Sequence, residues 1–291
     1  MNPETRAAAV ALYDRFTHEG MDRRVFMERL TRIAGGAAAA NALLLAIAAD
    51  PAAAAITKAD DPRLVIKKGS LGLKGIALDG YVAAPKDAKG KLPALIVVHE
   101  NRGLNAHIED VARRFALEGF FTVAPDFLTP AGGTPADEDA ARAAIGKLDY
   151  DAALAAAIAE IDALKALAST NGKVGVVGYC WGGAFVNRLA VAAGDRLSAG
   201  VSYYGPAPAT SEAAKVSAPL LIQLAGRDAR VNATAEPWAA ALKAAGKQVQ
   251  AVTYPDVDHA FNNDTSAERY NKAAADKAWA ASIAFFRQHL A

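Results

Sequence analysis

The chain has 291 residues, enough for one large α/β domain with a short extension, or for two small domains. Hydrophobic residues make up 53% of the chain and charged residues 22%, which allows a large core and argues against disorder. The formal net charge is +1 and no polybasic run is present, so we expect no nucleic-acid partner. The single cysteine excludes an internal disulfide and a cysteine-based zinc site, and the histidine spacing suggests no metal site, so we expect neither metal nor cofactor.

The first 57 residues differ in composition from the rest, and we predict a boundary between segments 1–57 and 58–291. A short amphipathic helix is predicted over 6–18. Arg23 and Arg24 then precede an uncharged run, 33–49, and three alanines at 52–54. This pattern resembles a twin-arginine export signal, which implies a periplasmic protein if the signal functions. The alternative is a cytoplasmic protein with a structural helix pair; in neither case do we expect a stable membrane span.

Residues 58–291 are predicted to alternate between strands and helices. A first antiparallel pair is expected at 63–69 and 76–85. The further predicted strands are 93–100, 120–127, 173–180, 199–205, 219–226 and 247–255. The predicted helices are 108–117, 137–146, 149–167, 182–193, 233–245 and 273–290. This order predicts an α/β fold with a mostly parallel sheet covered on both faces, in which ligands bind beyond the carboxyl ends of the strands.

Cys180 follows one of these strands within the stretch Gly178-Tyr-Cys-Trp-Gly182. This is the cysteine form of the G-x-S-x-G nucleophile elbow, in which small residues leave room for a strained turn between strand and helix. The start of the following helix favours a thiolate and an oxyanion. The alternative is a buried thiol that only packs. The flanking glycines favour the nucleophile.

Asp228 and His259 each follow a later predicted strand. An acid beyond a strand end can orient an imidazole, although Asp228 could equally be a turn or helix N-cap residue. The order nucleophile, acid, base is that of the α/β-hydrolases. Asp256 and Asp258 lie too near His259 in sequence to take the acid role easily. The other histidines fit less well, and His18 lies in the extension.

The segments "GYCWGG", "AGRDARV" and "DVDHAF", with "VVHENRGLN" upstream, resemble the dienelactone hydrolase (carboxymethylenebutenolidase) family over residues 63–291. The resemblance implies the α/β-hydrolase fold and a triad of Cys180, His259 and Asp228. It also implies that Glu100 regulates the thiol, and that the backbone N–H groups of Trp181 and Asn101 form the oxyanion hole. The alternative for Glu100 is a pair with Arg102.

The resemblance also implies a substrate pocket, and at one position of that pocket this sequence departs from the family's pattern. Tyr204 matches a tyrosine at the pocket edge, whereas Asn263 lies near the position of the family's substrate-binding arginine. The residues that could replace that arginine are Arg102, Arg227 and Arg230, with Arg142 a guess for a second one.

We therefore expect a carboxylic ester hydrolase of the carboxymethylenebutenolidase type, acting on a small lactone or ester through a thioester, as a monomer or homodimer. One alternative is a broad short-chain carboxylesterase or thioesterase. The alternative from another class is a binding protein that keeps a relic triad.

Overall fold

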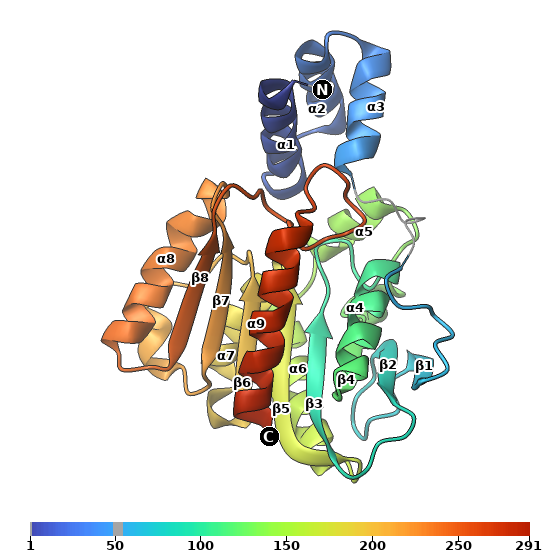
Figure 1. The fold of residues 1–291 in the computed structure, drawn as a ribbon, viewed down its shortest axis with the longest axis vertical. Coiled ribbons are helices and arrows are strands. Elements are labelled where there is room, and N and C mark those ends of the chain that lie inside the picture. Colours follow the sequence, from blue (N-terminus) through green and yellow to red (C-terminus); the bar gives the residue numbers. More distant parts are fainter. Residues whose placement is uncertain (1, 49–54) are drawn as a thin grey trace.

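The computed structural model describes residues 2–48 and 55–291 (Figure 1). A central sheet runs in the order β1-β2-β4-β3-β5-β6-β7-β8. Its strands are β1 Leu64–Ser70, β2 Asp79–Pro85, β3 Leu92–Val98, β4 Phe121–Pro125, β5 Thr170–Tyr179, β6 Ala199–Tyr203, β7 Leu220–Ala225 and β8 Val249–Tyr254. The pairs β1–β2 and β2–β4 are antiparallel and all other pairs are parallel. The mostly parallel sheet and its first antiparallel pair are thus confirmed.

Helices cover both faces of this sheet. The helices of the main body are α4 Ala106–Leu117, α5 Glu138–Ile145, α6 Tyr150–Ala166, α7 Trp181–Ala192, α8 Ala229–Ala244 and α9 Lys272–Leu290. Three short 3-10 turns that the sequence did not suggest lie at Thr129–Ala131, Gly194–Arg196 and Thr210–Lys215. Helix α8 begins four residues before its predicted start, because the Asp228 side chain accepts a hydrogen bond from Val231 N and caps it.

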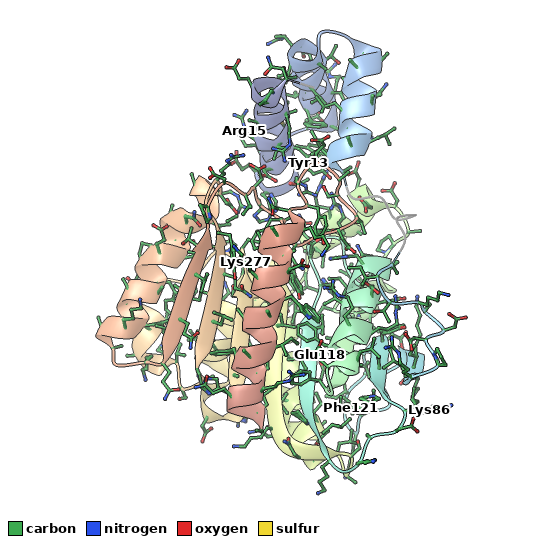
Figure 2. All side chains as sticks on the ribbon, in the orientation of Figure 1. Tyr13, Arg15, Lys86, Glu118, Phe121 and Lys277 are labelled. Carbon is green, nitrogen blue, oxygen red and sulfur yellow. The ribbon has the colours of Figure 1, made fainter. Side chains whose placement is uncertain are left out.

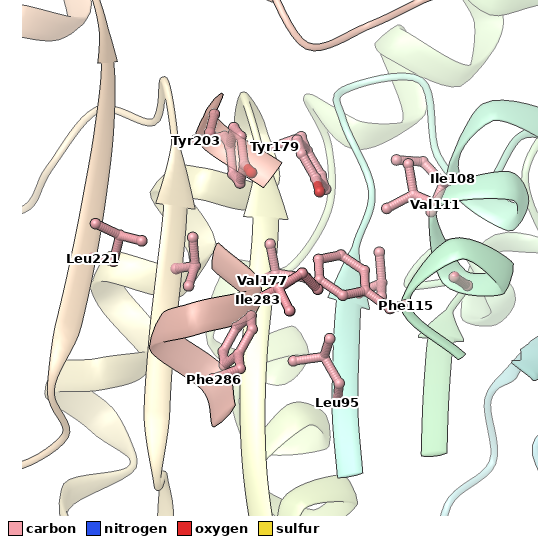
Figure 3. Close-up of a cluster of buried hydrophobic side chains, with 14 of the residues drawn as sticks. Leu95, Ile108, Val111, Phe115, Val177, Tyr179, Tyr203, Leu221, Ile283 and Phe286 are labelled. Carbon is pink, nitrogen blue, oxygen red and sulfur yellow. The ribbon is translucent and has the colours of Figure 1, made fainter. Parts of the chain in front are cut away.

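Each face of the sheet has its own hydrophobic cluster. On one face, α4 and α9 pack on the strands through side chains such as Phe115, Ile283 and Phe286, which meet Leu95 and Val177 of the sheet (Figure 3). On the other face, α6, α7 and α8 pack through apolar side chains of the second cluster. Because helices cover both faces of the sheet, its central strands must be apolar on both sides, as β3 is.

The N-terminal residues form a three-helix module at one end of the molecule (Figure 1). Its helices are α1 Pro3–His18, α2 Arg23–Ala34 and α3 Ala37–Ile47. A third hydrophobic cluster, which includes Leu12, Phe16, Phe26, Leu30 and Leu43, lies within the module. The module therefore has a core of its own, separate from the two clusters on the sheet.

The predicted uncharged run 33–49 is divided between two helices. Gly35 ends α2 in a left-handed conformation, with φ of 78°, and α3 starts after Gly36. Among the described residues no single helix is long and apolar enough to cross a membrane; α2 and α3 together meet that test only as a pair bent by 106°. The alanines at 52–54, on which the export-signal prediction partly depends, lie outside the described residues.

Candidate active site

Cys180 lies at the sharp turn between β5 and α7. Its backbone has φ of 56° and ψ of −110°, a conformation that costs an L-residue energy. The thiol is 5% exposed and stands at the N-terminal end of α7, where unpaired N–H groups favour negative charge. The strained turn predicted from the glycine pattern is present.

The glycines on either side of Cys180 make this turn sterically feasible. A Cβ on Gly178 would overlap the carbonyl group of Gly182. A Cβ on Gly182 would lie 2.5 Å from the carbonyl oxygen of Val98, in the neighbouring strand β3. The backbone of α7 can therefore approach both strands only when these two positions lack side chains.

His259 and Asp228 form a buried pair beside Cys180. His259 Nδ1 lies 2.5 Å from Asp228 Oδ2, and the two side chains are almost fully buried. Burial opposes a charge on His259, but the sulfur of Cys180 and the carboxylate of Asp228 outweigh it and raise the pKa of His259 to about 10. Burial also acts to raise the pKa of Asp228, yet the interaction with His259 keeps it below its ordinary value. Asp228 thus both caps α8 and binds the imidazole, so the two interpretations of this residue are compatible.

Asp256 and Asp258 are occupied by other partners. Asp256 pairs with Arg227 at 3.4 Å, and Asp258 pairs with Arg6 of α1 at 3.0 Å. Because both carboxylates are engaged in these ion pairs, Asp228 is the acid that binds the His259 imidazole.

Glu100 lies directly after β3, is 4% exposed and lines the same small space as Cys180. Its Oε2 accepts a hydrogen bond from Asn263 Nδ2 at 2.8 Å. Arg102 instead pairs with Glu138 and contacts the hydroxyl of Tyr13. The alternative pair between Glu100 and Arg102 is therefore not formed. The hydrogen-bond partner of Glu100 is instead the fully buried Asn263.

Trp181 and Asn101, whose backbone N–H groups are the predicted oxyanion hole, lie close to Cys180. Trp181 is the first residue of α7, so its N–H belongs to the group that a helix start leaves without an intrahelical partner. Asn101 lies in the turn after Glu100, and its side chain donates to the carbonyl of Thr17 in the N-terminal module. Both residues line the cavity that also contains Cys180.

His18 reaches the site from the end of α1. Its Nε2 lies 3.1 Å from Cys180 Sγ, and its ring packs edge-on against His259 with centroids 4.8 Å apart. His18 is thus a neighbour of the thiol that the sequence did not suggest, while His259 forms the pair with Asp228. His18 and Cys180 are 162 positions apart and the extension has no recognisable catalytic motif, so no sequence signal pointed to this contact.

Two spaces of very different size are lined by Cys180. A cavity of about 400 Å³ extends from Cys180, lined among others by Arg142, Tyr150, Trp181 and Arg230. On the side of Glu100 and Arg269 the space is only about 10 Å³, room for about one water molecule. A bound substrate would therefore extend into the larger cavity.

The predicted substrate-binding residues separate into two groups. Arg230 lines the cavity, and its Nη2 is buried without a hydrogen-bond partner among the described residues. Arg142 also lines it and stacks on the ring of Phe16. Arg102 is engaged elsewhere, as described above. Tyr204 is fully buried and packs edge-on against the His259 ring, with centroids 5.0 Å apart.

The sheet order, the helices on both faces and the strained turn after β5 define the α/β-hydrolase fold. The family model "Dienelactone hydrolase family" matches residues 78–290, so the chain belongs to that family. The three N-terminal helices and β1 lie outside this match.

Individual relatives agree with this membership. The chain is 32% identical over 257 residues to an Escherichia coli protein named "Putative carboxymethylenebutenolidase", covering 83% of this chain and 94% of the relative. It is 34% identical over 227 residues to "Protein usf" of Aquifex pyrophilus, covering 74% and 95%. A crystal structure described as a "Putative Dienelactone Hydrolase" from Klebsiella pneumoniae matches with a TM-score of 0.68 at 29% identity, covering 77% and 99%. The protein is a hydrolase of this family.

Proposed function

We propose that the protein hydrolyses a small carboxylic ester or lactone through a thioester formed on Cys180. The observation that supports this most directly is the convergence of the strained Cys180 turn and the buried His259–Asp228 pair at the carboxyl ends of three strands. This is the arrangement in which a base activates a nucleophile and an acid orients the base.

The reaction proceeds in two halves. The Cys180 proton passes to His259, and the thiolate attacks the carbonyl carbon. The C–O bond of the ester breaks, and the His259 imidazolium returns its proton to the departing oxygen. A water molecule then loses a proton to His259 and attacks the thioester, which releases the carboxylic acid and restores the thiol. The negatively charged Asp228 stabilises the imidazolium formed in each half.

The N–H groups of Trp181 and Asn101 are proposed to stabilise the oxyanion of both tetrahedral intermediates. Loss of one such donor costs about 3–4 kcal/mol in other acyl-transfer enzymes. The proposed role of Glu100 is to influence the thiol from within the small space that they share; its carboxylate is held by Asn263.

The cavity favours a substrate with a negative charge away from the reacting carbonyl. Arg230 offers a buried N–H without a partner, and Arg142 adds a second positive charge to the same wall. A buried guanidinium N–H is stabilised by a carboxylate that binds it. These residues are proposed to replace the family's arginine at the position where this chain has Asn263.

The experiment that tests the proposal compares Cys180→Ala and Cys180→Ser with the wild-type protein on a panel of aryl esters, lactones and thioesters. We expect Cys180→Ala to lose hydrolysis and Cys180→Ser to retain part of it, since the turn accommodates either atom. Near wild-type hydrolysis by Cys180→Ala would contradict the assignment. The panel also separates a lactone hydrolase from a broad short-chain carboxylesterase or thioesterase. Failure of the thiol to react with any activated ester would favour a binding protein.

The periplasmic location remains a prediction from the paired arginines. Intact-mass analysis of the protein purified from its native cells tests it, because signal removal would shorten the chain by about 50 residues, the length of the signal-like segment. A full-length mass would favour retention of the helical module.

A further inference from the structure

We propose that His18, carried by the N-terminal module, is a positioning residue for the Cys180 thiol. When α1 is docked, His18 accepts the S–H hydrogen bond and holds the enzyme in a resting thiol form. Formation of the reactive thiolate then requires α1 to withdraw. This proposal rests on the proposed role of Cys180 as nucleophile.

The tautomer of His18 follows from its partners. Nδ1 lies 2.8 Å from the backbone carbonyl oxygen of Asp14 and 2.9 Å from the hydroxyl of Thr17, which itself donates to the carbonyl of Tyr13. A carbonyl oxygen only accepts, so Nδ1 must carry the proton. Burial, reinforced by the nearby His259, holds the pKa of His18 well below its usual value, so the ring is neutral. Nε2 therefore presents a lone pair toward Cys180.

Several charged groups from different elements lie near this ring, including Arg142 of α5 across the larger cavity. The groups that face it are Asp14 on its own helix, Glu100 and Arg102 after β3, Arg230 after β7, and His259 and Arg269 after β8. The cations Arg230 and Arg269 add to the effect of burial and oppose protonation of His18. The imidazole at this position is thus suited to accept a proton in a hydrogen bond but not to carry a second one.

The lone pair of His18 Nε2, 3.1 Å from Cys180 Sγ, interacts differently with a thiol and with a thiolate. It attracts an S–H group and repels a thiolate, since the thiolate has no proton to donate. Within the described residues His18 is the hydrogen-bond partner of Cys180 Sγ, while Nε2 of His259 is buried and has none. The docked module therefore makes His18 compete with His259 for the thiol proton. Once α1 moves aside, the proton can pass from Sγ to Nε2 of His259.

Polar contacts dock α1 and α3 against the main body. Arg6 forms ion pairs of 3.0 Å with both Asp258 and Glu268, in the segment after β8 that also carries His259. The α3 end accepts hydrogen bonds at the carbonyl of Ile47 from Ser266 and Arg269. Tyr13 and Arg15 lie near the end of α1 that faces the main body (Figure 2). Docked in this way, the end of α1 places Thr17 and His18 in the wall of the cavity that reaches the thiol.

The test measures the rate of iodoacetamide alkylation of Cys180 as a function of pH. Because Cys180 is the single cysteine, thiol labelling reports on this site alone. We expect His18→Ala to lower the pH midpoint of alkylation by about one unit, and to raise the rate below that midpoint about tenfold, as the loss of one hydrogen bond to the thiol predicts. Glu4→Ala, an exposed change at the far end of the same helix, should leave the midpoint at its wild-type value.

A second variant addresses docking itself. Arg6→Ala removes both ion pairs and should shift the midpoint in the same direction as His18→Ala. The double variant should shift no further than His18→Ala, because both act through one contact. Additive shifts would show that Arg6 acts on the thiol independently of His18, and would overturn the docking part of the proposal.

The shape of the pH profile distinguishes the loss of the hydrogen bond from better access of the reagent, and a separate measurement checks folding. Better access alone raises the plateau rate and leaves the midpoint unchanged, and that outcome overturns the proposal. Thermal melting of His18→Ala checks folding, and His18→Gln, which also removes the imidazole, provides a second variant. Hydrolysis by Cys180→Ala tests the proposed function separately, because the alkylation midpoint does not depend on ester turnover.

Discussion

Glu160 offers a quantitative test of the energetics of the fold. It lies on α6, is fully buried, and neither carboxylate oxygen has a hydrogen-bond partner among the described residues. Burial alone raises its pKa from 4.5 to about 8. Between these two values the folded protein binds the proton more tightly than the unfolded chain, so stability falls as the pH rises.

The size of this effect follows from the shift, at 1.36 kcal/mol per pKa unit. The penalty is under about 1 kcal/mol at pH 5 and about 3 kcal/mol at pH 7, and it saturates above pH 8. Glu160→Gln removes the ionisation and keeps the shape. We therefore expect the variant to gain about 2 kcal/mol on the wild type between pH 5 and pH 7.

Urea unfolding of both proteins at pH 5, 6 and 7 measures this difference. The buried amide of Glu160→Gln also lacks hydrogen-bond partners, but the free-energy cost of this is the same at every pH. The informative quantity is therefore how the difference in unfolding free energy between the two proteins changes with pH. If the free energies of unfolding of the two proteins stay parallel from pH 5 to pH 7, Glu160 does not titrate as its burial requires, and the reasoning fails.

Three further predictions concern the site. Asp228→Asn keeps a good N-cap for α8, so the melting temperature should change little. Its kcat should fall by about 10⁴, as for the corresponding change in serine proteases. A matching loss of stability and activity would contradict separate roles. Gly182→Ala places a Cβ 2.5 Å from the Val98 carbonyl and should cost about 1–3 kcal/mol or prevent folding, while Gly36→Ala, with open space around it, should be tolerated in urea unfolding. Arg230→Ala should raise KM about 10- to 100-fold for an ester with a carboxylate on its acyl part and leave a neutral analogue unchanged, and equal effects on both would refute an anion site.

The sheet and the elbow could be predicted from the sequence because local patterns determine them. The continuous apolar run of β3 indicates a strand buried on both faces, and Gly178 and Gly182 indicate the turn around Cys180. Asp228 and His259 could be placed because each follows a strand whose end lies at the same edge of the sheet.

Contacts of the N-terminal module could not be predicted in this way. The docking of α1 depends on pairs such as Arg6 with Glu268, which are 262 residues apart and leave no periodic pattern. The same holds for His18, whose role depends on where α1 ends relative to the sheet. Asn263 was noted as a departure from the family, but its bond to Glu100 required the positions of both loops.

The separate core of the N-terminal module has a consequence for engineering. Phe26 and Leu30 belong to that core, whereas Phe16 also contacts Arg142 of the main body. Docking residues outside the core, such as Arg6, can therefore be redesigned without repacking the module's interior. The module could then be exchanged as a unit, with the end of α1 at Thr17 and His18 forming part of the cavity wall next to the thiol. A library varied at Thr17, with His18 kept, would alter the cavity wall while the strained elbow stays untouched.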